Sequence, residues 1–304
     1  MKRWKKFCVI AAATFAVTST TFSAGGEGEP SEVKAETIDY DMDSGVVSAA
    51  GNVFVKHTAT EKSSTSKNDN VPSEVTADDV QYDMNNGTVT ANGNVILKYG
   101  DGRATGGRAM YNTNTQEAYL LDNVTVTRND LKITCGSLRN DGQGHMQADG
   151  NVYVVQTVPP NEKYPNGDTR TFRGEHVDYY PNDRGHVFIS TGGIITNSDG
   201  TFTADQMEAW LDEEHYVGTG NAHVVNPPRQ LEAGGDRIDY YAGEDGKAVL
   251  SGNAWANQNN NTMRGNRLTV YLADDNNLKV TPSAPKATEL PGEDKPFADK
   301  AGKV

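Results

Sequence analysis

Acidic side chains near the start of the chain alternate with other residues in the spacing of a calcium loop. Asp39, Asp41 and Asp43 could supply oxygen ligands to a hard cation. Such a loop also needs a bidentate Glu at its twelfth position, where this chain has Ala50. A related segment, Gln81–Gly87, carries fewer acids. The sequence therefore predicts ordinary hairpin turns in both places and no calcium site.

The other residue types that could carry catalysis or bind a metal show no working arrangement. The six histidines are His57, His145, His176, His186, His215 and His223. No two of them have the His-Glu-x-x-His spacing of a zinc protease, and no Gly-x-Ser-x-Gly elbow occurs. Pairs of carboxylates prove nothing in a chain with 41 acidic residues. We therefore expect a protein that is not an enzyme and that needs neither a metal nor a cofactor.

Residues 1–26 have the composition of a secretory signal peptide. Basic residues precede an uncharged apolar run from Phe7 to about Phe22, and small residues follow at Ser23, Ala24 and Gly25. The run is short for a membrane span, which needs about 20 apolar residues. We therefore expect the segment to be cleaved and the protein to be exported to the periplasm.

The charge and the cysteines of the exported chain limit its function further. Residues 1–26 carry four basic and no acidic side chains, so their removal changes the formal charge from −13 to −17. This acidic charge argues against a surface that binds nucleic acid. It also argues against docking on anionic lipid headgroups through a basic patch. Only Cys135 then remains, which excludes a disulfide within the chain; we expect it in the core.

One motif recurs along nearly the whole exported chain. A small residue is followed three positions later by an apolar residue, and two positions further, in most copies, by Tyr. The small residues are Ala35, Ala77, Gly106, Cys135, Gly174, Ala204, Gly235 and Gly265. The apolar residues are Ile38, Val80, Ala109, Leu138, Val177, Met207, Ile238 and Leu268. The third positions are Tyr40, Tyr82, Tyr111, Asn140, Tyr179, Ala209, Tyr240 and Val270.

The spacing inside each copy predicts a bent strand, a turn and a second strand. A step of two residues keeps side chains on one face of a strand, whereas the step of three breaks the alternation as a bulge does. The small residue there permits a close backbone approach. After turns such as Asn85–Gly87 the alternation resumes, with Val95 and Leu97 on one face. Eight copies therefore predict an all-β protein of eight two-strand units with one apolar face.

Two polar inserts, at about 60–74 and 157–171, lengthen the repeat. The second contains Pro159 and Pro160 and is the better candidate for a boundary. We expect one module at 31–157, a second at 172–281 and a disordered tail at 282–304, where Pro recurs among charged residues. Whether a single sheet continues through the second insert is open at this point.

The repeat resembles the OstA-like repeat of the LptA family, which also occurs in LptC and in the periplasmic part of LptD. Besides the three columns, Gly-Asn steps in register with them carry the resemblance: Gly51–Val53, Gly93–Val95, Gly150–Val152, Gly220–Ala222 and Gly252–Ala254. The resemblance covers roughly residues 33–280. The chain is longer than a typical LptA-like protein, and the copies near Thr113–Thr115, Asn140 and Gly192–Gly193 lack part of the signature.

The resemblance implies an open, antiparallel β-jellyroll whose interior holds the acyl chains of lipopolysaccharide on their way from the inner to the outer membrane. It implies LptC-like inner-membrane and LptD-like outer-membrane partners, and head-to-tail self-association through edge strands. A partner would supply energy, because the chain has no ATP-binding loop. The expected lipid-binding residues are Ile38, Tyr40, Val53, Val80, Tyr82, Val95, Leu97, Val124, Leu138, Val152, Val177, Met207 and Ile238.

Two alternatives remain open from the residues alone. The inward columns fit a closed hydrophobic core as well as a lipid-lined groove. Most copies of the motif are spaced by about 30 residues. Gly-rich repeats of this length also suit a secreted adhesin or carbohydrate-binding β-solenoid. The pairing of the strands distinguishes these classes, because a solenoid needs parallel coils and a jellyroll needs antiparallel hairpins.

Overall fold

The computed structural model describes residues 31–57, 73–99, 102–161, 164–213, 215–241, 246–271 and 280–282. Its strands form one 19-stranded antiparallel sheet. They are β1 Ser31–Lys34, β2 Thr37–Asp41, β3 Val46–His57, β4 Ser73–Asp83, β5 Thr88–Tyr99, β6 Gly102–Asn112, β7 Ala118–Arg128, β8 Leu131–Asn140, β9 Met146–Val158, β10 Asp168–Tyr180, β11 His186–Ile189, β12 Gly193–Asn197, β13 Gly200–Ala204, β14 Gln206–Trp210, β15 His215–Asn226, β16 Leu231–Tyr241, β17 Lys247–Gln258, β18 Asn261–Tyr271 and β19 Val280–Pro282.

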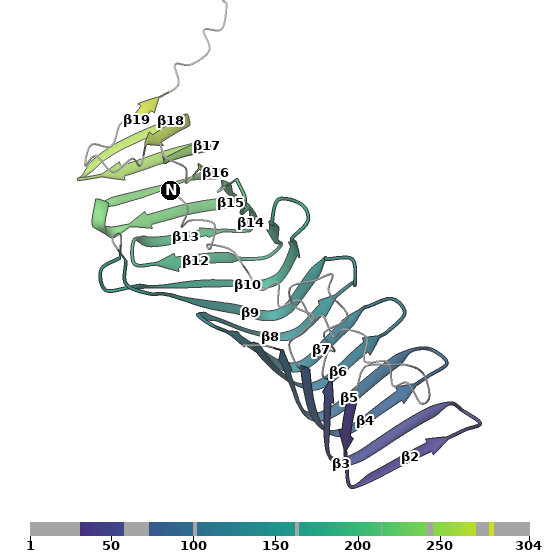
Figure 1. Cartoon of the computed structure of the whole chain (residues 1–304). Helices are drawn as coiled ribbons and strands as arrows, with labels where there is room; N and C mark the ends of the chain where they lie inside the picture. The colour runs from purple at the N-terminus through teal and green to yellow at the C-terminus, as the bar shows by residue number, and fades with distance from the viewer. Residues whose placement is uncertain are drawn as a thin grey trace, which may run out of the picture.

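The strands follow one another along a long axis in chain order, from β2 and β3 at one end to β18 and β19 at the other (Figure 1). Three positions in this order hold two short strands in place of one long one: β1 with β2, β11 with β12, and β13 with β14. Counted this way, the sheet contains the eight expected two-strand units. The prediction of an all-β antiparallel jellyroll is confirmed, and the antiparallel pairs contradict a parallel coil in the described residues.

The bend within each unit arises where the expected Gly-Asn steps lie. Gly93 and Asn94 have φ angles of 72° and 49°, in the left-handed region that Gly and Asn tolerate. The register between β5 and β6 shifts between Asn92 and Val95, as it does in a β-bulge. The step of three residues in the sequence therefore marks a real corner of each strand.

A small residue faces the corner from the neighbouring strand. Val95 lies directly opposite Gly106, and Val124 lies opposite Cys135. Because the strands bend sharply here, a large side chain opposite the valine would meet the backbone of the next strand. The small side chains of the Ala, Gly and Cys column thus allow one bent unit to stack on the next without a steric clash.

In four of the copies, an acid–amide pair on the outer face bridges the corner to the neighbouring strand. Asn94 Nδ2 donates to both carboxylate oxygens of Asp78, at 3.0 and 3.2 Å. The equivalent bonds in other copies are Asn52 to Glu36, Asn221 to Asp205 and Asn253 to Asp236. In each case the acid directly follows the small residue of its copy. The asparagine that adopts the left-handed backbone conformation therefore also stabilises the corner, through the hydrogen bond of its side chain.

The expected turns are present and stack on each other. Residues 42–45, 84–87 and 181–185 form turns, and Asn85 Nδ2 donates to the Ser44 carbonyl at 2.8 Å. Asn112 continues the contact by donating to the Asn86 carbonyl. The calcium-like segment near Asp41 is therefore an ordinary turn, in which the Asp41 carboxylate accepts the Asp43 amide.

One sheet continues through the second insert. β9 and β10 pair from Asp168 opposite Val158 to Tyr179 opposite Met146. Whether 31–157 and 172–281 are separate modules stays a prediction. The signal peptide, almost all of the tail and most of the first insert lie outside the described residues. Within the described part of the chain, no helix combines the length and the hydropathy needed to cross a bilayer.

Candidate functional site

The inner face of the bent sheet has two walls that meet at the corners. The first wall lies between the turns and the corners, and the second wall continues beyond the corners. One register row crosses the first wall strand by strand: Ile38, Ala49, Val80, Ala91, Ala109, Leu120, Leu138, Ala148, Val177, Ile189, Met207, Gly218, Ile238, Leu250 and Leu268. Every member of this row except Gly218 is apolar and carries a side chain.

A matching row crosses the second wall. Its members are Val33, Val55, Val75, Leu97, Ala104, Val126, Ile133, Val154, Phe172, Ile195, Phe202, Val224, Ala233, Ala256 and Met263. Most buried residues of both walls and of the corners belong to one hydrophobic cluster, which extends from Ala49 to Val270. The protein therefore has a single apolar lining along the described sheet.

The structure brings the expected lipid-binding residues onto this lining. The buried ones, between 1 and 7% exposed, are Val53, Val80, Val95, Val124, Leu138, Val152, Val177, Met207 and Ile238. Leu97 packs against the cluster and Tyr82 is half-buried. Contact of any of these residues with lipid stays a prediction.

Ile38 and Tyr40 share the register rows of the lining and yet are 52 and 49% exposed. They lie on β2, which among the described strands pairs with β3 alone and thus forms an edge of the described sheet. Within the described residues no further strand covers them, and Met42 beside them is 81% exposed. The apolar lining is therefore open at this end.

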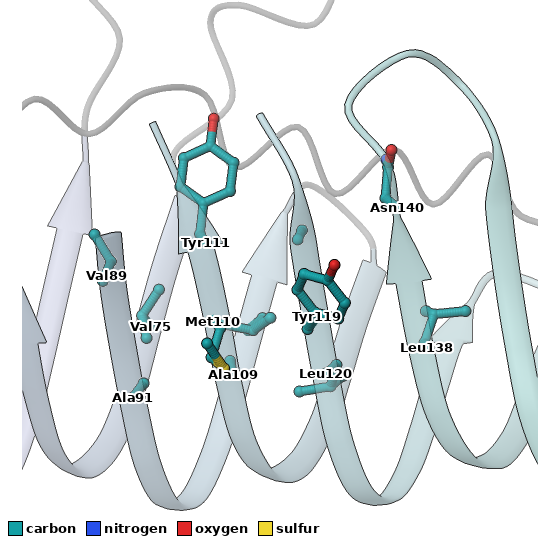
Figure 2. A pocket seen from close by; sticks show the side chains of 12 residues that line it. Val75, Val89, Ala91, Ala109, Met110, Tyr111, Tyr119, Leu120, Leu138 and Asn140 are labelled. Atoms are coloured by element: carbon teal, nitrogen blue, oxygen red, sulfur yellow. The ribbon is translucent and has the colours of Figure 1, made fainter. Parts of the chain in front are cut away.

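Space remains between the walls in the stretch from β4 to β8. The cavity there measures about 50 Å³ and is partly open to solvent. Val75, Leu97, Leu120 and Leu138 are among the lining residues. In Figure 2 their strands curve together at the corners, and the walls enclose the labelled side chains. Towards the other end, Leu250 and Leu268 are 0% exposed.

The rim of this space is polar. Tyr111 and Asn140 occupy the tyrosine column of their copies and point away from the corners in Figure 2, while Leu120 lies deeper. Tyr111 is 7% exposed, and burial raises the pKa of its hydroxyl. The site is thus amphipathic, with hydrocarbon below and hydrogen-bonding groups at the mouth.

The face opposite the lining carries a row of stacked rings: His145, Tyr180, His186, Trp210, His215 and Tyr241. Consecutive ring centroids lie 4.3 to 5.8 Å apart. Carboxylates pair with the imidazoles, as in His186 Nε2 to Glu208 Oε2 at 3.2 Å. Because each ring covers the face of the next, the row braces the outer surface of β10–β16.

His176, also on this outer face, is held by two carboxylates. Its Nδ1 bonds to Asp149 on β9, and its Nε2 lies 2.8 Å from Asp178 on its own strand. The hydrogen bond to Asp149, together with the charge of Asp178, raises the pKa of His176 above its ordinary value. His145 Nε2 bonds to the same Asp178, at 2.7 Å.

Cys135 lies in the small column and is 7% exposed, as expected for a core residue. Burial, assisted by the charge of Asp149, raises the pKa of its thiol to about 11. Among the described residues, no group of three or more His, Cys, Asp or Glu side chains is placed to hold a metal ion.

The sequence prediction named only Leu97 from the row on the second wall, and it missed the acid–amide pairs at the corners. Val55 and Val75 could have been found, because they continue the alternation that begins at Val53 and Ala77. The pairing of Asp78 with Asn94 could not, since nothing in their spacing shows that they meet across two strands.

Two segments of the chain match models of known families. Residues 182–276 match the model described as LptA/(LptD N-terminal domain) LPS transport protein. Residues 15–130 match the model described as lipopolysaccharide-assembly, LptC-related. The matches confirm the resemblance to LptA/OstA-like lipopolysaccharide transport proteins.

The solved structures similar to the chain include that of LptH, the LptA homologous periplasmic component of the lipopolysaccharide transport device from Pseudomonas aeruginosa. The identity is 21%, the alignment covers 38% of this chain and 78% of LptH, and the TM-score is 0.30. No curated protein matches the chain.

Proposed function

We propose that this chain, which carries the OstA-like repeat of the lipopolysaccharide transport proteins, binds lipopolysaccharide in the periplasm and forms part of a bridge to the outer membrane. The observation that carries the proposal is the single apolar lining inside a bent sheet, which continues strand by strand to an exposed edge at β2. Such a lining gives hydrocarbon an uninterrupted path out of water.

The energy of hydrocarbon transfer explains why such a path is needed. Each buried methylene group is worth about 0.8 kcal/mol, so several acyl chains exposed to water would cost tens of kcal/mol. A lining of Val, Leu, Ile and Ala offers dispersion contacts of similar strength all along its length. Because the contacts are similar at each step, lipid can advance without leaving one especially tight position.

The two walls have to move apart for lipid to pass. A small cavity lies between β4 and β8, and Leu250 and Leu268 near the other end are fully buried. The corners are the natural hinges, because each wall is a regular sheet and the Gly-Asn steps separate them. In this proposal, acyl chains take the place of contacts between opposite walls.

The edges of the sheet are the proposed docking sites for neighbours. β2 exposes Ile38, Tyr40 and Met42, and on the side away from β3 it pairs with no other described strand. A strand added there would continue both the hydrogen bonding and the apolar lining. LptC-like and LptD-like proteins and further copies of this chain are the proposed partners, and the energy would come from an ATPase among them.

Photocrosslinking in cells tests the proposal. A photoreactive amino acid replaces Val95 or Val152, whose side chains are 1 and 2% exposed on the lining. We expect adducts with lipopolysaccharide at both positions. Thr125 is the matched control, because it follows Val124 on β7 and its side chain leaves the opposite face.

Adducts at Val95 and Val152 without one at Thr125 would support lipid transport along the lining. Crosslinks to protein alone at the two inner positions would contradict it and favour a closed core in a scaffold protein. Binding that collapses at raised salt would contradict recognition through acyl chains, since salt screens exposed charges and not hydrocarbon contacts.

A further inference from the structure

The mouth of the space between β4 and β8 carries hydrogen-bonding groups from two strands at one level. Tyr111 on β6 pairs with Ala118 on β7, which pairs with Asn140 on β8. The three residues therefore leave the sheet in one register row. Figure 2 shows the polar ends of Tyr111 and Asn140 at the open side, with Leu120 and Leu138 nearer the corners.

Both polar side chains have a donor available at this level. The Tyr111 hydroxyl makes no hydrogen bond within the described part of the chain, although its ring is buried. Asn140 uses its Oδ1 to accept the Gly142 amide at 2.9 Å. That bond fixes the side-chain amide and leaves its Nδ2 group as the donor for a ligand.

A ligand that fits this site needs a hydrogen-bond acceptor at the level of the two donors. It also needs a hydrocarbon part that extends from there towards the corners. The ester or amide carbonyl that joins an acyl chain to its head group has this arrangement. Neither donor is charged, whereas phosphate sites in proteins usually employ Arg or Lys. The level of the two side chains, at the boundary between the apolar lining and water, is where an acyl carbonyl would come to rest.

We propose that Tyr111 and Asn140 hydrogen-bond the carbonyl oxygens at the heads of acyl chains held between β4 and β8. The proposal rests on the proposed function and adds the depth at which the lipid sits. The two residues lie two strands apart, or about 10 Å, so each reaches a different carbonyl. The site therefore fits an amphiphile with more than one acyl chain.

A pair of soluble lipids that differ only in the carbonyl tests this inference on the purified full chain. The probes are a short-chain diacyl phosphocholine and the dialkyl ether analogue of equal chain length, both below micelle-forming concentration. One net hydrogen bond corresponds to roughly a 2- to 10-fold change in affinity. We therefore expect the ester to bind the protein more tightly than the ether by roughly this factor for each donor.

Two conservative variants remove the donors singly. Tyr111→Phe deletes only the hydroxyl, and Asn140→Asp keeps the oxygen that accepts the Gly142 amide. Each should reduce the preference for the ester while affinity for the ether is retained. Tyr179→Phe is the matched control, because Tyr179 occupies the same column on β10, away from the lining of this space.

The outcomes separate this inference from the proposed function. Equal binding of ester and ether by the unaltered chain, or an unchanged preference in both variants, would overturn the inference and leave lipid binding intact. Equal weakening of ester and ether in both variants would assign the donors to the phosphate instead. Failure of the unaltered chain to bind either probe would count against the proposed function itself.

Discussion

Val95 on β5 lies directly opposite Gly106 on β6, at the corner where the two walls meet. A Cβ atom on Gly106 would come within 2.7 Å of the Leu121 carbonyl oxygen and 2.8 Å of a Leu120 methyl group. The absence of a side chain at this position is therefore a requirement of packing and not of backbone conformation.

Replacement of this glycine should destabilise the sheet. We expect Gly106→Ala to lower the free energy of unfolding by about 1–3 kcal/mol, the usual cost of overpacking. Denaturant titration measures the change. Gly265→Ala is the control, because a Cβ there meets nothing closer than 3.5 Å. Equal losses in the two variants would show that clash is not the reason for the small column.

The corner residue Asn94 combines a left-handed backbone with a hydrogen bond, and substitutions can separate the two. Its φ is 49°, which costs roughly 1–2 kcal/mol for an ordinary L-residue. We expect Asn94→Ala to reduce stability by about that amount and Asn94→Gly by less, because Gly accepts the conformation. Asp78→Ala removes the bond alone. If Asn94→Gly proved as harmful as Asn94→Ala, the bond to Asp78 and not the backbone would dominate.

His176 should make stability depend on pH. Its pKa is raised in the folded state, mainly by the bond to Asp149, so the stabilisation is complete below the unfolded value of about 6.5. It is lost as pH rises through the folded value. We expect His176→Gln to lower the melting temperature by about 1–3 °C in mild acid and by less in mild alkali.

His223→Gln is the comparison for that measurement. His223 pairs with the single carboxylate of Glu232, at 3.0 Å, and lies outside the row of stacked rings. Its replacement should produce a smaller change between the two pH values. A melting difference for His176→Gln that grows with pH would have the wrong sign and would refute the ion-pair explanation.

Cys135 should react slowly in the folded protein. With a thiol pKa of about 11, its thiolate fraction near pH 8 is about 100-fold below that of an exposed cysteine. Alkylation can be followed by mass spectrometry of the peptide that contains Cys135. We expect native labelling to be slower by at least this factor and to become fast in denaturant. Rapid labelling of the native chain would mean that β8 opens readily.

The sequence predicted the repeated unit well because its signals are local. Steps of two and three residues determine which side chains share a face, and this places Val80 and Tyr82 correctly. The exposure of a side chain on this face depends instead on whether its strand lies at an edge of the sheet. Ile38 has the same local pattern as Val80 and yet lies on an open edge.

Contacts that depend on register could not be predicted in the same way. The stacking of His186 on Trp210 requires β11 to pair with β14, which skips two intervening strands in the chain. Tyr111 and Asn140 stand at equivalent positions of successive copies, but only the space beneath them distinguishes these two positions from others in the column.

Pairing in chain order makes the architecture modular. Each hairpin touches mainly the hairpins before and after it, so stability approximates a sum of nearest-neighbour terms and folding can spread from any well-formed unit. Duplication or deletion of a hairpin would change the length of the molecule without altering the contacts that remain. The distance that such a protein spans is therefore set by the number of its copies, a quantity that recombination can adjust in single steps.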